Sequence, residues 1–271
     1  MDEKVVLPNE EATLLSCASA AQVRVRDVHD IRRAAEVLGQ LMATWGLRVA
    51  FTHDIGDSHT PVDADGRVLA TEVFGWSDDD LAWWRNTSLA LSSPLALACR
   101  LESDIFWANA QGIYTCLPNA RIMTVSLAAF EKRACVRAAI VVPVHLPFGQ
   151  IGAISFVSQD PEKSDLSQEY TQLGEALKLI GWTFISSFAR AVRGRQRLPV
   201  NSVLTKREIE CVRLAATGLT DGGIADALGR RRATVRFHLD KAAAKLDAVN
   251  KCQTIFKAAQ LGYLSPIIQI W

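Results

Sequence analysis

Arginine and lysine side chains cluster in one short stretch near the C-terminal end of the chain. Arg230, Arg231 and Arg232 are consecutive, and Arg236 and Lys241 follow at helical spacing. Apolar residues recur every three or four positions through the same stretch, namely Val235, Leu239, Ala242 and Leu246. A helix here therefore has one apolar face and one basic face. Cations on an exposed helical face neutralise DNA phosphates, so the pattern predicts a DNA-recognition helix.

Three residues in and before this stretch have the spacing of a helix-turn-helix. Ala225 is small enough for two helices to cross closely, and Gly229 tolerates the positive φ of a turn. Val235 then supplies an apolar anchor near the start of the second helix. Together they predict two packed helices joined by a short turn.

Capping residues extend this prediction to an all-α domain over residues 204–271. Thr205-Lys-Arg-Glu208 is a capping box, which starts a helix that ends at Gly218. Thr220 or Asp221 caps a second helix, and Asn250 caps a fourth that runs to about residue 261. We expect four helices in total.

The residues that point away from the apolar face of the basic helix are the expected DNA contacts. Arg231 and Thr234 are expected on phosphate, Arg236 on a guanine edge and Phe237 on a thymine methyl. The full set adds Arg232 and Lys241. The alternative is a solvated basic helix. For His238 two roles are possible from the sequence: it contacts a phosphate, or it packs beside the apolar residues.

Charge is divided unevenly along the chain. Residues 201–271 hold 11 basic and 6 acidic residues, a net charge of +5, whereas residues 1–200 hold 19 and 23, a net charge of −4. A basic module on an acidic larger domain predicts polyanion binding at one end. Residues 191–203 contain a glycine, a proline and three arginines without an apolar period, and they are the expected linker.

Composition is that of an ordinary soluble protein, with 49% hydrophobic and 22% charged residues among 271. No apolar run reaches the roughly 18 residues of a membrane span, and the acidic N-terminus is unlike a signal peptide. We therefore expect a cytoplasmic protein. The six cysteines lack metal-binding spacing, so reduced thiols are expected, with no metal and no cofactor.

Periodicity in residues 1–190 predicts an α/β domain. Helical spacing covers residues 28–45, 77–91, 95–101, 122–132 and 164–190. Strand patterns cover residues 47–53, 138–145 and 151–157, and the last two are separated by a turn typical of a hairpin. The predicted fold is a three-layer α/β sandwich, an antiparallel sheet with helices on both faces.

Aromatic residues concentrate in this first domain. Trp83, Trp84, Trp107 and Tyr114 are candidates to line a small-molecule pocket, and the alternative is ordinary core packing. The acidic run over residues 78–80 could offer carboxylates to a ligand or metal, but a helix N-terminus explains it better. The histidines are scattered without metal or triad spacing, so nothing favours an enzyme.

The C-terminal stretch resembles the LuxR-type (GerE-like) helix-turn-helix over about 60 residues. The matching segments, in order, are LTKREIECVRLAATGLT, IADALG and TVRFHLDKAAAKLDAVNK. Gly223 stands where that family usually has Glu, and Arg230 where a buried aliphatic residue is usual. Gly222 and Gly223 together should loosen the middle helix, at roughly 1 kcal/mol per glycine against alanine.

The first domain resembles, more weakly, the acyl-homoserine-lactone-binding domain of quorum-sensing LuxR regulators. Pro94, Ile105-Phe106-Trp107 and Val142-Pro143-Val144 fall in the family's order. The resemblance implies that Trp107 and Ser155 lie in a ligand pocket. Ser93 stands at the position of the Asp that holds the ligand's amide.

Further departures from this pattern also fall at the expected ligand site. By ungapped counting, Asp80 stands at the position of the lactone-binding Trp, and Trp84 at that of a Tyr. Ala139 replaces a typical Gly. These departures favour an orphan ("solo") regulator with another signal, or a divergent receptor.

We therefore expect a homodimeric transcription regulator that reads an inverted repeat in promoter DNA. Its first domain senses a small molecule, an acyl-homoserine lactone or another signal, and shifts the population of DNA-competent dimers. Two alternatives stay open. The first domain could serve dimerisation alone, or it could be a sensor or enzyme for which DNA binding is secondary.

Overall fold

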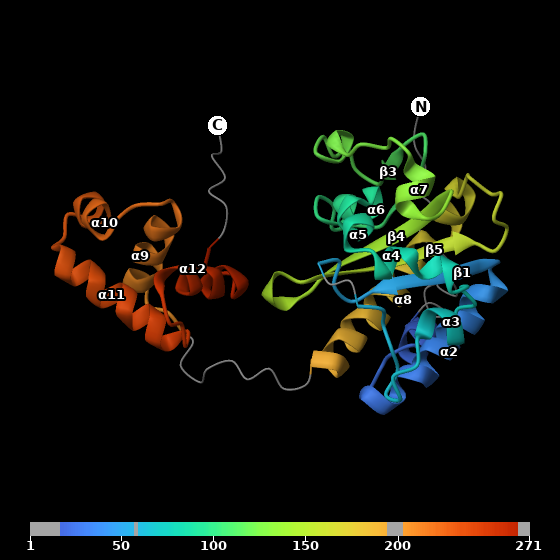
Figure 1. The fold of residues 1–271 in the computed structure, drawn as a ribbon, viewed down its shortest axis with the longest axis horizontal. Helices are drawn as coiled ribbons and strands as arrows, with labels where there is room; N and C mark the ends of the chain where they lie inside the picture. Colours follow the sequence, from blue (N-terminus) through green and yellow to red (C-terminus); the bar gives the residue numbers. More distant parts are fainter. Residues whose placement is uncertain (1–16, 57–58, 194–202, 265–271) are drawn as a thin grey trace. The chain divides into compact units, whose positions relative to one another are not determined.

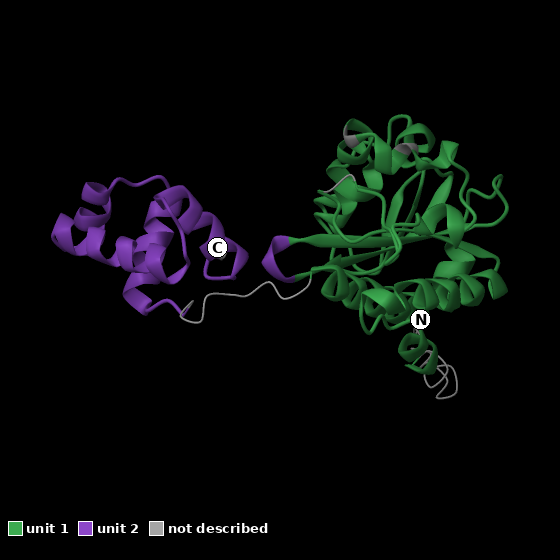
Figure 2. Ribbon diagram, turned by 60° about the horizontal axis from the view of Figure 1, so that its bottom comes forward, with its two compact units in different colours: residues 1–146, 150–194 green, residues 147–149, 195–271 purple. Residues whose placement is uncertain are grey.

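The computed structural model describes residues 17–56, 59–193 and 203–264 (Figure 1). The chain divides into two compact units, residues 1–146 with 150–194 and residues 147–149 with 195–271 (Figure 2). The helix that precedes the expected linker continues to Arg193, three residues into the range 191–203. Residues 194–202 of that range lie outside the described residues.

A five-stranded antiparallel sheet forms the centre of unit 1. Its strands lie in the order β1-β5-β4-β2-β3. In chain order they are β1 (Leu47–Thr52), β2 (Phe106–Asn109), β3 (Ile113–Thr115), β4 (Ala138–His145) and β5 (Ile151–Ser158). The predicted hairpin of β4 and β5 is confirmed, and it turns through the 3-10 segment η4 (Pro147–Gly149).

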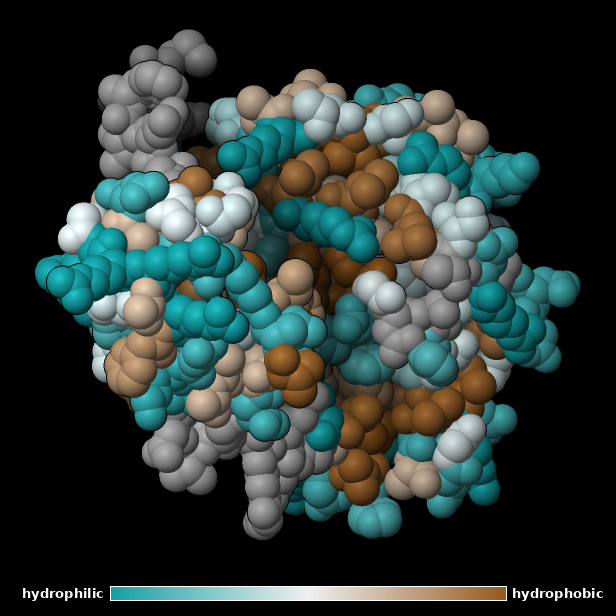
Figure 3. All heavy atoms as spheres, turned by 60° about the vertical axis from the view of Figure 1, so that its left-hand side comes forward, coloured by the Kyte–Doolittle hydropathy of each residue, from teal (hydrophilic) through white to brown (hydrophobic). Residues whose placement is uncertain are grey.

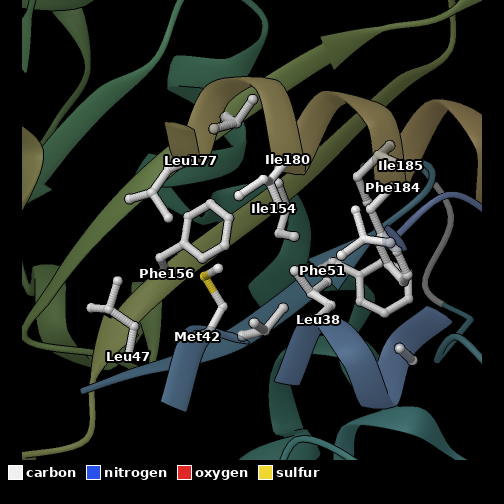
Figure 4. Packing of buried hydrophobic residues seen from close by; sticks show 14 of the residues in the cluster. Leu38, Met42, Leu47, Phe51, Ile154, Phe156, Leu177, Ile180, Phe184 and Ile185 are labelled. Atoms are coloured by element: carbon white, nitrogen blue, oxygen red, sulfur yellow. The ribbon is translucent and has the colours of Figure 1, made fainter. Parts of the chain in front are cut away.

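Two long helices cover one face of this sheet: α2 (Ile31–Thr44), which follows the 3-10 segment η1 (Val28–Asp30), and α8 (Ser167–Arg193). Both are amphipathic, and their apolar residues meet the strands. Figure 4 shows Leu38 and Met42 of α2 and Leu177 and Phe184 of α8 converging on Phe156 and other strand residues. This packing forms the larger apolar core.

Helix α8 lies unusually close to the sheet because glycines occupy the contact. A methyl group on Gly181 would stand 2.6 Å from Cγ2 of Ile154, and one on Gly152 of β5 would stand 2.5 Å from Cγ2 of Ile185. Both distances are shorter than carbon atoms can approach, so the packing requires glycine at these positions.

Short helices cover the other face, which completes the three-layer sandwich predicted from sequence. They comprise α4 (Ala82–Arg85), α5 (Thr87–Ser92), α6 (Pro94–Cys99) and α7 (Phe130–Ala134), with the 3-10 segments η2 (Asp79–Leu81) and η3 (Ile122–Thr124). Helix α3 (Leu69–Glu72) packs beside them. Leu95, Cys99 and Phe130 meet Phe106 and Val141 in a second apolar core.

Two of the predicted helices of this layer are wrong. The helix expected over residues 77–91 breaks at Asn86, whose side chain accepts a hydrogen bond from Leu89 N at 3.1 Å and so caps a new helix. The helix expected over residues 122–132 is replaced by η3, a turn and α7. Ala129 has the left-handed φ of 51°, which interrupts the helix.

Unit 2 contains the four predicted helices: α9 (Lys206–Ala216), α10 (Asp221–Leu228), α11 (Arg232–Lys245) and α12 (Lys251–Gln260). The capping box is present, with Thr205 and Glu208 bonded reciprocally. Thr220 caps α10 and Asn250 caps α12. Gly229 takes a φ of 60° at the turn, as predicted.

A buried ion pair joins the first and third helices of unit 2. The Lys245 ammonium lies 2.8 Å from the Glu208 carboxylate, which is only 6% exposed. Burial would raise the pKa of Glu208, but hydrogen bonds from Lys245 and from the Thr205 backbone outweigh it and hold the pKa below its ordinary value. Glu208 therefore fixes the capping box and the position of α11 together.

Candidate DNA interface and candidate ligand cavity

The sequence-predicted DNA contacts all lie on the exposed side of α11. Arg231, Arg232, Thr234, Arg236, Phe237 and Lys241 are exposed, whereas Val235, Leu239 and Ala242 are buried against α9, α10 and α12. Phe237 is 56% exposed, and the Lys241 ammonium lies 5.7 Å from the centre of its ring. An exposed aromatic residue beside a row of cations is an unusual surface feature, and it fits contact with a base edge.

A concave surface next to this row extends the basic region. It is lined by Arg207 of α9, by Arg230 and Arg231 in the turn, and by Thr234 and His238 of α11. His238 is half-buried at this surface, so both of its expected roles stay open. Arg230 is exposed, so the position where the family has a buried aliphatic residue contributes a cation instead.

An apolar cavity lies inside unit 1, between the sheet and the short helices. Its volume is about 70 Å³. Its floor is a row of residues paired across three strands, because Ala50 lies opposite Ser155 and Ser155 lies opposite Val141. Its walls come from α4, α6 and α7, including Trp83, Leu95 and residues 134–136. Mainly apolar walls with a few polar groups are typical of small-molecule sites.

The side chain of Ser93 is the one that most clearly marks this cavity as a binding site. Ser93 is fully buried, it lines the cavity, and its Oγ atom has no hydrogen-bond partner in the described structure. Its position follows from the sequence, since a residue before proline is restricted to extended backbone and cannot continue α5. A buried hydroxyl without a partner is costly, and a bound polar group would satisfy it.

One arginine and three backbone carbonyls hold the segment around Ser93. The Arg133 guanidinium donates to the carbonyls of Ser92, Ser126 and Ala128. It therefore ties the α5–α6 junction to the loop before α7. No feature of the sequence pattern indicated this role, because the partners are 5 to 41 residues away from Arg133.

Four of the six predicted ligand-binding residues line the cavity: Trp83, Trp84, Ser93 and Ser155. Trp84 offers its ring but not its N–H, which donates to Phe51 O at 3.0 Å. Trp83 packs edge-on against Trp84, with ring centres 5.8 Å apart. The pair thus forms an aromatic corner of the wall.

Trp107 and Tyr114 do not line this cavity, which corrects the expectation from sequence. Trp107 pairs with Ile140 and belongs with it to the core beneath α8, on the opposite face of the sheet. Tyr114 stacks on Trp107 at 4.2 Å and is 40% exposed. Strand alternation places Phe106 and Ala108 on the cavity side of β2 and Trp107 on the other side.

The cavity mouth carries a carboxylate and a thiol. Asp80, for which a helix start was favoured over a ligand contact, lines the cavity together with Cys135 and the deeper Cys99, two thiols that had no predicted role there. Burial raises the pKa of Cys99 to about 12, and burial with the nearby Asp80 charge raises the pKa of Cys135. Both thiols are therefore neutral near pH 7.

Within the described ranges, no group of three or more His, Cys, Asp or Glu side chains is arranged to hold a metal ion. In the same part of the chain, no helix has the length and apolarity needed to cross a bilayer.

Fold and sites together define a two-unit protein, an α/β sandwich with an internal cavity and a basic helix-turn-helix. Residues 202–258 match the family model described as bacterial regulatory proteins, luxR family. The transcriptional activator protein VanR of Vibrio anguillarum is 32% identical over 141 residues, which is 51% of this chain and 58% of VanR. The transcriptional activator protein AhyR of Aeromonas hydrophila is 29% identical over 192 residues, covering 69% of this chain and 70% of AhyR.

A solved structure extends the likeness over nearly the whole chain. Escherichia coli SdiA aligns with a TM-score of 0.50 and 18% identity, covering 94% of this chain and 99% of SdiA. At that identity the likeness concerns the fold. Residues 202–258 therefore match the luxR-family model, and the chain as a whole is similar to the two named activators and spans about 58% to 70% of their length.

Proposed function

We propose that this protein is a transcriptional regulator that binds promoter DNA through α11 and senses a small molecule in the cavity of unit 1. The domain boundaries that go with this proposal are residues 1–190 for sensing and dimerisation, 191–203 for the linker and 204–271 for DNA binding. The observation that carries the sensing function is the buried, unpartnered hydroxyl of Ser93 in an apolar cavity. Because promoter DNA is its target, we place the protein in the cytoplasm.

DNA binding is supported by the separation of roles on α11. Its buried residues hold the helix in unit 2, and its exposed residues are basic or aromatic. We assign Arg231 and Thr234 to phosphates, and Arg236 and Phe237 to bases. Arg232 and Lys241 complete the set.

A pair of single substitutions tests these assignments on a duplex that the wild-type protein selects from a random pool. Arg231→Ala should weaken binding to all sequences and reduce the slope of log affinity against log salt by about 1. Arg236→Ala should cost about 1–3 kcal/mol and relax the preference at one base pair. Arg190→Ala, an exposed cation on α8, removes the same charge and should change neither. Unaltered affinity in both α11 variants would contradict the DNA assignment.

Small-molecule sensing is tested by identifying what the cavity holds. Mass spectrometry of the purified full-length protein should reveal a co-purified small molecule, and thermal unfolding should shift upward when it is added back. Ser155→Leu, which fills the cavity floor from β5, should abolish that shift. A shift that is unchanged in Ser155→Leu would place the ligand elsewhere.

Dimerisation is the third part of the proposal. Helix α12 exposes Phe256 at 61%, and Val249 before it is 87% exposed. Apolar side chains at such exposure fit a self-complementary contact between two copies. Sedimentation should show a dimer, and Phe256→Glu should shift it toward monomer.

The alternative function is a ligand-independent regulator whose unit 1 serves dimerisation alone. The small cavity volume of about 70 Å³ favours it, since ligand sites commonly span about 300–1,000 Å³. Under this alternative, Ser155→Leu stabilises unit 1 without altering DNA affinity. Under the sensing proposal, the same substitution uncouples DNA affinity from the ligand.

A further inference from the structure

In the described part of the chain, the cavity lining carries one negative charge and no positive charge, and this restricts the kind of molecule that the cavity can bind. Among the described residues that line it, Asp80 is the one charged side chain. The remaining polar groups are the hydroxyls of Thr52, Ser93 and Ser155 and two neutral thiols. None of the described residues that line the cavity is a Lys, Arg or His. A ligand in the cavity therefore meets a net negative site.

Asp80 lines the cavity and has one carboxylate oxygen free to accept a hydrogen bond. Its Oδ2 atom accepts hydrogen bonds from the backbone N–H and the hydroxyl of Ser77, at 2.9 and 2.7 Å. These two bonds hold the carboxylate in place. In the described structure no donor bonds to Oδ1, so one carboxylate oxygen remains to accept from a ligand.

A polar hollow of about 290 Å³ adjoins the cavity, and the two share Trp76, Asp80, Cys135, Val136 and Val157. Its cations are already engaged. Arg48 stacks at 4.0 Å on Trp76 and donates to Gly75 O, and Arg137 pairs with Glu162 at 3.0 Å. Lys163 pairs with Glu169. Arg137 and Lys163 are therefore paired with carboxylates, whereas Arg48 is held by a ring and a carbonyl and has no carboxylate partner among the described residues.

Aromatic rings complete the chemistry of the mouth. Trp76, Trp83 and Trp84 line the cavity together with Asp80. A carboxylate beside several tryptophans attracts cations, because the ring faces and the carboxylate are both negative. Such a group of residues disfavours a carboxylate at the mouth, because two negative charges repel each other. Figure 3 shows the surface as a mixture of hydrophobic and hydrophilic residues on the face that it draws.

From these contacts we infer that the cavity selects a small apolar or aromatic molecule with a hydrogen-bond donor at one end, best a primary ammonium. The donor binds Asp80 at the mouth, the apolar part packs on Trp83 and Trp84, and Ser93 meets the buried end. This inference rests on the proposed sensing function and narrows its ligand class. It predicts discrimination against molecules whose head group only accepts hydrogen bonds.

Three matched probes test the inference on the full-length protein: 2-phenylethylamine, 2-phenylethanol and phenylacetate. They share a phenyl ring and differ in the head group. Isothermal titration should give the tightest binding for the amine, weaker binding for the alcohol and the weakest for phenylacetate. A charge-assisted bond should separate the amine from the alcohol by about tenfold.

Asp80→Asn supplies the decisive variant, since Asn keeps the acceptor that Ser77 needs and removes the charge. The amine should lose about tenfold in affinity and match the alcohol. Asp79→Asn, a neighbouring exposed carboxylate that does not line the cavity, is the control and should retain the wild-type order. An equal amine affinity in Asp80→Asn and wild type overturns the inference.

The remaining outcomes separate this inference from the sensing function itself. Phenylacetate binding as tightly as the amine, with binding lost in Ser155→Leu, overturns the ligand class but leaves the cavity as a binding site. Binding that persists in Ser155→Leu overturns both. Failure of all three probes to bind at millimolar concentration overturns the donor-head-group inference.

Discussion

The candidate site of unit 2 lies on the surface of one helix, whereas the candidate site of unit 1 is enclosed by many segments of the chain. In unit 2 the DNA-facing side chains are exposed on one helix, within eleven residues from Arg231 to Lys241. In unit 1 the cavity is assembled from three strands, several short helices and the loops between them. A site on one helix is separable from the fold that carries it, whereas a site built from many segments is part of the core. The predictions below test this contrast.

The largest effect is expected where site and fold are separable. Replacing Arg231, Arg232 and Arg236 together by alanine should reduce DNA affinity by at least about 1,000-fold, since each removes a phosphate or base contact. All three are exposed, so the free energy of unfolding should change by less than about 0.5 kcal/mol. Denaturant unfolding beside a binding titration checks both. A large stability loss would show that the interface is not separate from the fold.

Glu208→Gln should destabilise unit 2 while leaving the exposed side chains of α11 unchanged. Glutamine can keep the Thr205 bond but leaves the Lys245 ammonium without its carboxylate, at a cost of about 2 kcal/mol. Glu210→Gln is the control, because its pair with exposed Arg207 should contribute less than about 1 kcal/mol. If the two variants lose similar free energy of unfolding, the Glu208–Lys245 pair stabilises unit 2 no more than an exposed ion pair does.

The same carboxylate predicts a pH dependence. The folded-state pKa of Glu208 is lowered, so its contribution to stability is complete above the unfolded pKa of about 4.3 and is lost as pH falls through the folded pKa. Unfolding of unit 2 measured between about pH 6 and 3 should show this loss in wild type and a smaller one in Glu208→Gln.

The contrast also explains how much could be predicted from sequence. In unit 2 the caps at Thr205 and Asn250 and the turn at Gly229 are local signals that were identified correctly, and the structure selects Thr220 over Asp221 as the cap of α10. Such features depend on residues within four positions of each other. The order and ends of these helices follow from them.

In unit 1 the long, strongly periodic elements were predicted, as were the shorter β1 and α6, but several other short elements were not. Strands β4 and β5 and helices α2 and α8 matched, but β3 was missed and the helix over 77–91 broke at Asn86. Trp107 was assigned to the cavity from the family resemblance, since the short apolar run over residues 105–107 did not show which side chains share a face. One residue of register moves a side chain to the other face, and tertiary packing decides it.

Gly181→Ala tests the close packing of α8 on the sheet. The added methyl group would stand 2.6 Å from Ile154, so unit 1 should lose about 1–2 kcal/mol, even though alanine favours a helix. Gly174→Ala on the same helix meets nothing within 4 Å and should be neutral or stabilising. Thermal unfolding of both variants measures the difference. Equal behaviour would mean that α8 can move away from the sheet at little cost.

The smallest effect is expected at Gly222 in α10. A methyl group there meets only Thr220 Oγ1, at 3.7 Å, so Gly222→Ala should stabilise unit 2 by about 0.5–1 kcal/mol. Because Gly222 lies in the first turn of α10, away from the exposed row of α11, DNA affinity should stay the same if site and fold are separable. A DNA titration of Gly222→Ala at fixed salt decides this. A weaker complex despite the more stable domain would show that a loose α10 assists DNA binding, and that the interface depends on more than the face of one helix.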